Sequence, residues 1–228
     1  ITYLDWMFSA WGWTLSVSAL GLFVAMILGV LMGTLRTLPP DNLLNRSLAL
    51  LGTVWVELFR NIPVLVQVFL WYHVIPALFP VMKGFPSFVL VSLALGFFTS
   101  ARIAEQVRAG IGSLPRGQRY AALAVGLTTT QSYRYVILPM ALRIVIPPLT
   151  SESMNIIKNS SVAFAVSVAE LTLFAMQAQE ETSKGIEIYL GVTALYVVSA
   201  LSVNRVMAFI ESRTRVPGFI AAASSGGH

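Results

Sequence analysis

Long apolar runs constrain the fold of this chain more than any other feature of its sequence. No charged residue occurs between Asp5 and Arg36, and residues 9–35 are apolar almost throughout. A helix needs about 20 mostly apolar residues to cross a bilayer, so this run predicts a membrane span. Charged residues make up 11% of the whole chain, whereas soluble domains carry roughly 25%. The sequence therefore predicts an all-α membrane protein.

Comparable runs recur along the chain and predict about five membrane-spanning helices. The predicted spans are residues 9–35, 53–75, 87–107, 140–170 and 188–210. They are expected to form one transmembrane domain over residues 1–217, and residues 218–228 are expected to be a disordered tail or an artificial extension. Pro147 and Pro148 lie inside the fourth span and are expected to bend or break it, because proline removes a helical hydrogen bond.

The distribution of basic residues predicts how these helices are oriented. Arginines gather in residues 36–51 and 112–139 and again after the last span, whereas the other loops contain only Lys83 and Lys184 as basic residues. Loops rich in Lys and Arg remain in the cytoplasm. We therefore expect the N-terminus outside, and the C-terminus and residues 112–139 inside. The net charge of +5 follows from these loops and does not predict nucleic-acid binding.

The cytoplasmic segment between the third and fourth spans is short and basic. Residues 116–143 contain four arginines and no acidic residue. Helix formers predict one short helix over residues 119–125 and a second over residues 130–137, with a sharp turn at Gly126 between them. Pro139 is expected to begin the next span. The two helices would make a compact unit, too short and too basic to cross a bilayer.

The spacing within this segment resembles the coupling loop of bacterial ABC importer permeases. The family pattern has a Glu before two alanines, and Tyr120 takes its place here, as is common in the branch for polar amino acids. The resemblance implies that this loop couples to a separate ATPase through Arg116, Gly117, Tyr120, Ala121, Ala122, Gly126, Leu138 and Pro139. By spacing alone, an ordinary basic loop is the alternative.

Three further stretches resemble the same family and occur in the same order. They are the stretch with Arg60, Pro63 and Gln67, the stretch with Arg102, Glu105 and Arg108, and the stretch with Glu152, Asn155, Lys158, Asn159, Ser160 and Ser161. The chain is thus similar, over nearly its whole length, to permease subunits of polar amino-acid ABC importers, most closely those for glutamate and aspartate. The resemblance implies the type I importer permease fold.

A row of polar residues follows the two prolines of the fourth span. Glu152, Asn155 and Asn159 recur at helical spacing and share one face. An acid and two amides in an otherwise apolar helix favour a face that lines a pore. The alternative is that these side chains form hydrogen bonds between helices.

Two departures from the family pattern bear on the substrate. Arg102 stands where many relatives have Tyr, and Asn159 stands where the family has Asp. A gained cation and a lost acid favour an anionic or neutral substrate. Arg102 could bind a substrate carboxylate with its two-pronged guanidinium, or it could pair with Glu105 three residues on; both alternatives stay open. Glu57 and Arg60 have the same spacing and could also pair.

The resemblance and the polar pattern together indicate which side chains would meet the substrate. They are Arg60, Gln67, Arg102, Glu105, Glu152, Asn155, Lys158, Asn159 and Ser160. The implied partners are two ABC ATPase subunits, a second permease chain of the same or a related kind, and a periplasmic or surface substrate-binding protein. The implied location is the lipid bilayer of a bacterial cytoplasmic (inner) membrane.

The sequence contains no motif for chemistry by this chain itself. It has no phosphate-binding Gly-x-x-x-x-Gly-Lys-Ser/Thr loop, no His and Cys cluster for a metal and no nucleophile motif. We therefore expect no enzyme activity, no cofactor and no metal in this chain, with ATP and Mg²⁺ bound by the partner ATPase.

Other functions stay open at this stage. A stand-alone secondary amino-acid transporter or channel could use the same polar row, although it would not need a coupling loop. A membrane anchor without a pore would use the polar residues for helix packing. An importer of the same type for neutral or basic amino acids would differ only in its substrate.

Overall fold

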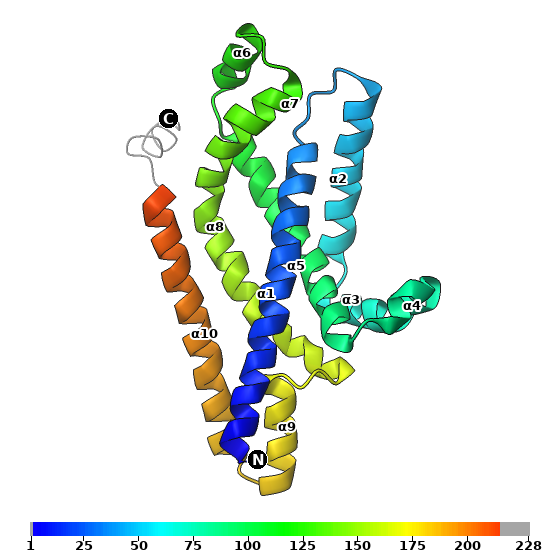
Figure 1. The fold of residues 1–228 in the computed structure, drawn as a ribbon, viewed down its shortest axis with the longest axis vertical. Coiled ribbons are helices and arrows are strands. Elements are labelled where there is room, and N and C mark those ends of the chain that lie inside the picture. Colours follow the sequence, from blue (N-terminus) through cyan, green and yellow to red (C-terminus); the bar gives the residue numbers. More distant parts are fainter. Residues whose placement is uncertain (1, 215–228) are drawn as a thin grey trace.

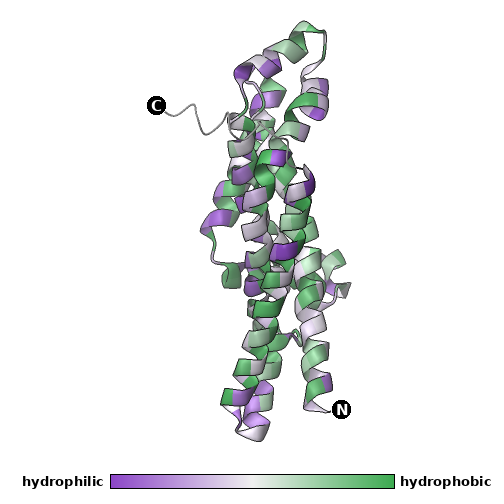
Figure 2. Cartoon of the chain, turned by 90° about the vertical axis from the view of Figure 1, so that its left-hand side faces the viewer, coloured by the Kyte–Doolittle hydropathy of each residue, from purple (hydrophilic) through white to green (hydrophobic). Residues whose placement is uncertain are grey.

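The computed structural model describes residues 2–214, so the tail expected over residues 218–228 lies outside the described part. Within that part every regular element is helical (Figure 1). Among residues 2–214, four helices are long and apolar enough to cross a membrane, or five if a sharply bent pair counts as one span. This agrees with the predicted all-α class and about five spans. Hydrophilic residues gather toward the ends of the molecule but also occur part-way along the helices (Figure 2).

Helices α1 (Tyr3–Leu35) and α5 (Ser87–Gly112) pack together along much of their length at the centre of the molecule (Figure 1). Small residues on α1 allow this close approach, as is typical of membrane helices. A Cβ atom at Gly33 would lie 2.6 Å from the Ala104 carbonyl oxygen and 2.8 Å from Val107 Cβ. A larger side chain at this position would therefore push the two helices apart.

The second predicted span, over residues 53–75, is wrong as a single helix. Helix α2 (Leu43–Asn61) begins within the predicted loop and ends just before Pro63, where the chain turns by 105°. Proline has no N–H and disfavours helical geometry in the preceding residue, and Ile62 is accordingly extended, with φ −92° and ψ 128°. The following segment comprises α3 (Val64–Phe69), a π-helical turn (Leu70–Val74), α4 (Ile75–Leu78) and a 3-10 turn (Pro80–Gly84).

The first of the two short helices predicted between the third and fourth spans is present. Helix α6 (Arg116–Ala124) is followed by Gly126, whose φ of +88° confirms the predicted turn, because glycine adopts this left-handed region without strain. The second helix differs from the prediction. Helix α7 (Thr129–Ser132) is not separate from the next span, since helical geometry continues without interruption from Thr129 to Val166.

This continuous run consists of α7, a π-helical turn (Tyr133–Ile137), α8 (Leu138–Asn159) and a 3-10 turn (Ser160–Val166). A break at Pro147 and Pro148 is not observed, because both residues lie inside α8. Neighbouring helices can hold a proline-containing membrane helix in place when its own hydrogen bonds are lost, and α8 packs against both α5 and α10 (Gly185–Thr214). One helix thus leads from the α6–α7 turn into the bundle.

The fourth span ends earlier than residue 170. Ser167 adopts a left-handed conformation, with φ 60°, and helix α9 (Leu171–Thr182) follows it. Glu170 caps α9 by accepting hydrogen bonds from the backbone N–H groups of Thr172 and Leu173. Helix α9 and the N-terminus lie at one end of the molecule, and α6 and α7 lie at the other (Figure 1). This arrangement fits the predicted placement of the two ends on opposite sides of a membrane.

Candidate functional site

An ion pair joins α5 to α8 part-way along both helices. Arg102 Nε donates to Glu152 Oε2 at 2.8 Å, and Arg102 Nη2 donates to Glu152 Oε1 at 3.2 Å. Gln106, one turn further along α5, donates from Nε2 to Glu152 Oε1 at 3.2 Å. The Glu152 side chain is 4% exposed, whereas the Arg102 side chain is 46% exposed. The pair therefore combines a buried acid with an accessible base.

The surroundings of this pair explain why the acid needs a charged partner. Ile103 follows Arg102 directly, Leu149 precedes Glu152 by one turn, and both belong to a buried apolar cluster. A carboxylate in such surroundings loses its hydration and is stable only when it is paired and hydrogen-bonded. The two-pronged contact with a guanidinium meets that need. Chemically, this guanidinium is the accessible group that could receive another carboxylate.

The alternative pairing of Arg102 with Glu105 does not occur, because Glu105 lies in a second ionic cluster. Its carboxylate contacts Arg36 at the end of α1, Arg108 at 3.1 Å and Arg60 of α2 at 3.7 Å. Arg60 also contacts Glu57 at 3.2 Å, which confirms the pair predicted from their spacing. Because three arginines surround one acid, removal of any one of them leaves Glu105 paired.

The other side chains expected to meet the substrate have different surroundings. On α8, Asn155 and Asn159 are half-buried and Lys158 is exposed. Ser160 is buried, and its Oγ donates to the Ile157 carbonyl oxygen at 2.7 Å. The structure thus brings Arg102 to Glu152 and Arg60 to Glu105, while the remaining side chains do not join either cluster.

Gln67 has a structural role at the bend between α2 and α3. Its buried side chain donates from Nε2 to the carbonyl oxygens of Phe59 at 2.7 Å and Ile62 at 3.0 Å. Both carbonyls belong to the end of α2, where helical donors are missing. The side chain therefore braces the bend that Pro63 creates.

Sequence reasoning did not assign Gln106 or Arg36 to a site. Gln106 follows Arg102 by four residues, so the two share a face of α5, and this spacing could have indicated that both reach one partner. Arg36 could not have been found in this way. Its contact with Glu105 depends on how the end of α1 packs against α5.

Most of the residues expected to couple to an ATPase lie on or directly after α6, and α6 and α7 form one end of the molecule (Figure 1). The exposed ones are Arg116, Gly117, Tyr120, Ala121, Gly126 and Pro139, whereas Leu138 is half-buried and Ala122 is buried. Tyr120 is 67% exposed although its ring is largely apolar. Tyr133 anchors this end to the chain beyond α1, because its hydroxyl donates to the Thr37 carbonyl oxygen at 2.6 Å.

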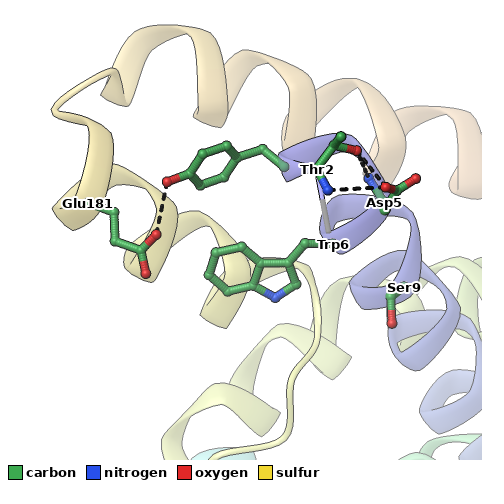
Figure 3. A pocket seen from close by; sticks show the side chains of 6 residues that line it. Thr2, Asp5, Trp6, Ser9 and Glu181 are labelled. Carbon is green, nitrogen blue, oxygen red and sulfur yellow. Dashed lines mark hydrogen bonds between the residues drawn. The ribbon is translucent and has the colours of Figure 1, made fainter.

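A pocket of about 590 Å³ lies at the opposite end, where α1 meets α9 (Figure 3). Its polar groups already serve the fold. Asp5 and Thr2 form the capping box of α1, and the Tyr3 hydroxyl donates to Glu181 Oε2 at 2.9 Å. This pocket joins the two helices and contains none of the predicted site residues.

Comparison with known proteins defines the class of this chain. The family model described as binding-protein-dependent transport system inner membrane component matches residues 7–216. The match covers nearly the whole sequence, and the chain belongs to this family. The resemblance to importer permeases, drawn from the coupling loop and the polar stretches, is thereby confirmed.

Individual relatives are permeases for amino acids. The chain is 43% identical to the glutamate/aspartate import permease protein GltJ of Escherichia coli (strain K12), over 95% of this chain and 90% of that protein. It is 34% identical to the probable amino-acid ABC transporter permease protein PatM of Vibrio harveyi, over 89% of this chain and 88% of that protein. The chain is thus homologous to permease proteins of amino-acid ABC transporters.

Solved structures agree with this assignment. The crystal structure of an amino acid ABC transporter with histidines has a TM-score of 0.77 at 28% identity, over 92% of this chain and 95% of that chain. An inward-facing structure of the MetNI methionine ABC transporter has a TM-score of 0.78 at 21% identity, over 92% of this chain and 97% of that chain. At this identity the likeness supports only the assignment of the fold. The fold is that of ABC importer permeases, as predicted.

Proposed function

We propose that this chain is the membrane permease subunit of an ATP-driven importer for acidic amino acids, with glutamate and aspartate as substrates. The observation that carries the proposal is the uninterrupted helix from Thr129 to Val166. This helix leads from the end of the molecule that carries the coupling motif to Glu152. Glu152 pairs with Arg102 inside the bundle. A force applied at one end can therefore change the position of the ion pair at the other.

The partners follow from the family and from the exposed surfaces. Two ATPase subunits would bind ATP and Mg²⁺ and close on the α6–α7 end of two permease chains, of the same or related sequence. A substrate-binding protein would deliver the amino acid at the opposite end, outside the inner membrane. Closure would move α7 and α8 together, since one continuous helical run joins them. The pore would then open alternately to the two sides.

The proposed substrate class rests on Arg102 and on the relatives. A half-exposed guanidinium in an otherwise apolar bundle can bind a carboxylate in two-pronged geometry. Asn155 and Asn159 of α8 would line the path of the amino acid. Neither side chain carries a negative charge that would repel an anionic substrate. The relative with 43% identity is named as a glutamate/aspartate permease, which supports the same substrates here.

The test is uptake of radiolabelled amino acids into proteoliposomes that contain the chain with its ATPase, sister permease and binding protein. We expect ATP-dependent uptake of glutamate and aspartate in preference to glutamine and arginine. ATP-dependent uptake of arginine or glutamine instead would retain the importer and reject the acidic substrate. Uptake without ATP or the ATPase would indicate a stand-alone carrier and contradict the proposal.

A further inference from the structure

The ion pair between Arg102 and Glu152 presents its two charges differently to a ligand. The guanidinium of Arg102 is half-exposed and can be approached from outside the pair, whereas Glu152 lies beneath it and is almost fully buried. A carboxylate ligand could therefore contact Arg102 only by competing with Glu152. Such competition would leave Glu152 without its main partner.

A second acceptor lies beside Glu152. Gln106 uses its Nε2 to donate to Glu152, and its Oε1 is buried without a hydrogen-bond partner among residues 2–214. A buried acceptor without a donor is destabilising, so this oxygen is suited to a ligand that brings N–H groups. Two acceptors, one of them charged, thus adjoin a two-pronged donor.

We propose that an acidic amino-acid zwitterion inserts between Arg102 and Glu152, with its side-chain carboxylate on the guanidinium and its ammonium group on Glu152 and Gln106 Oε1. Glu152 is then the residue that selects for the α-ammonium group. This inference rests on the proposed function, because it concerns the substrate of the same site. It gives each of the three side chains a partner both before and after substrate binds.

The physical argument is one of paired charges. A zwitterion replaces each half of the ion pair, so neither Arg102 nor Glu152 becomes an unpaired charge in apolar surroundings. Glutarate has the carbon chain and both carboxylates of glutamate but no ammonium group. It would satisfy Arg102 and leave Glu152 buried and unpaired, which strongly opposes binding. The site should therefore reject dicarboxylates that lack the amino group.

The experiment measures equilibrium binding of radiolabelled glutamate to the purified complex of permease and ATPase subunits, without the binding protein, with glutarate as competitor. For the wild type we expect at least about a 100-fold preference for glutamate, as for sites whose polar groups would be left unpaired by the wrong ligand. For Glu152→Gln we expect the preference to fall below roughly tenfold, because a neutral amide no longer requires the ammonium group. Glu152→Asp should retain most of the preference.

Controls separate this inference from folding and from the proposed function. Glu57→Gln removes an exposed acid elsewhere in the membrane domain and should leave the preference unchanged. If Glu152→Gln fails to give a monodisperse complex, Gln106→Leu tests the same idea and should lower the preference severalfold. An unchanged preference in the tested variant, or a wild type that binds both ligands equally, overturns the inference. The proposed function is decided independently by the uptake assay with the wild type.

Discussion

Helix α5 makes two different interfaces, one with α1 and one with α8. Against α1 it packs at glycine positions so closely that a Cβ at Gly33 would overlap backbone atoms. Against α8 the backbones lie further apart: a Cβ at Gly110 would meet the Val145 side chain at 2.5 Å but would lie 3.4 Å from the Ala141 carbonyl oxygen. The half-exposed Arg102 also pairs with Glu152 across this interface. Close backbone packing cannot be rearranged in small steps, whereas an ion pair can exchange partners. We infer that α1 and α5 form the fixed part of the permease and that α8 moves against it.

The ionic clusters of the two interfaces show the same contrast. Glu105, between α1, α2 and α5, is shared among Arg36, Arg60 and Arg108. Glu152 depends on Arg102 as its one charged partner among residues 2–214. Loss of a single arginine therefore leaves the acid with a charged partner in the first cluster, whereas in the second it leaves Glu152 with only the hydrogen bond from Gln106. Variants at the two interfaces test this comparison.

Overpacking of the α1–α5 interface should have the largest effect, because it acts on the fold itself. Gly33→Leu places a side chain where even a Cβ would lie 2.6 Å from a backbone oxygen. Insertion of such bulk into a packed interface costs about 1–3 kcal/mol or more, and we expect little folded protein. The measurement is the yield of monodisperse complex by size-exclusion chromatography. Gly12→Leu is the matched control, since no atom of the described residues lies within 4 Å of a Cβ at Gly12. Equal yields for both variants would contradict a fixed α1–α5 interface.

Arg102→Ala should abolish transport of the acidic substrate. The complex should still assemble, at a lower yield, because Gln106 still donates a hydrogen bond to Glu152. It removes the only proposed carboxylate ligand, and we expect glutamate uptake to fall at least about 100-fold, equivalent to about 2.7 kcal/mol. Uptake into proteoliposomes and the elution profile of the complex are measured together. Glutamate uptake by Arg102→Lys should lie between that of the wild type and that of Arg102→Ala, because an ammonium group lacks the two-pronged geometry of a guanidinium. Purified Arg102→Ala complex that transports glutamate normally would show that the assignment is wrong.

Gly126→Asp tests whether the α6–α7 turn transmits movement to α8. Space is available for the side chain, but a φ of +88° is unfavourable for a residue with a Cβ. We expect the chain to insert and ATP to be hydrolysed, while uptake per ATP falls by roughly tenfold because the turn no longer transmits closure. Gly112→Asp, also at a position with open space, is the control. Normal uptake at normal expression would refute this coupling role.

Arg108→Gln should have the smallest effect. Arg36 and Arg60 still surround Glu105 in this variant, and Arg108 itself is about half-exposed. Exposed ion pairs contribute about 0–1 kcal/mol, so uptake should change less than about threefold. A loss as large as that of Arg102→Ala would mean that the two clusters do not differ in the way proposed.

Several features of the fold could be predicted because they depend on local sequence. The apolar runs predicted the spans that became α1, α5 and α10, since length and hydropathy alone decide which helices can cross a bilayer. Gly126 predicted a turn that only glycine makes easily, and its φ confirms it. Spacing predicted the contact between Glu57 and Arg60, which lie on one helix.

Proline was harder to interpret from sequence. Pro63 interrupts its span with a 105° turn, whereas Pro147 and Pro148 lie inside a continuous helix. The difference depends on what surrounds each proline. At Pro63, Gln67 satisfies the carbonyls that the break exposes. Helix α8, which contains the other two prolines, packs against α5 and α10. Neither kind of support can be read from a single segment.

Local sequence thus determined the class of the protein, its membrane segments and the residues that carry the family resemblance, because hydropathy, helix spacing and turn chemistry act over a few residues. The partners of the buried charges were decided only by the tertiary structure. Arg102 and Glu105 are three residues apart and could have paired, yet Arg102 contacts Glu152, 50 residues away. Glu152 is buried between helices and must have a charge beside it, whereas Glu105 has three arginines within reach. Which of these contacts forms depends on the packing of α5 against α8, and that packing also decides where a substrate carboxylate could bind.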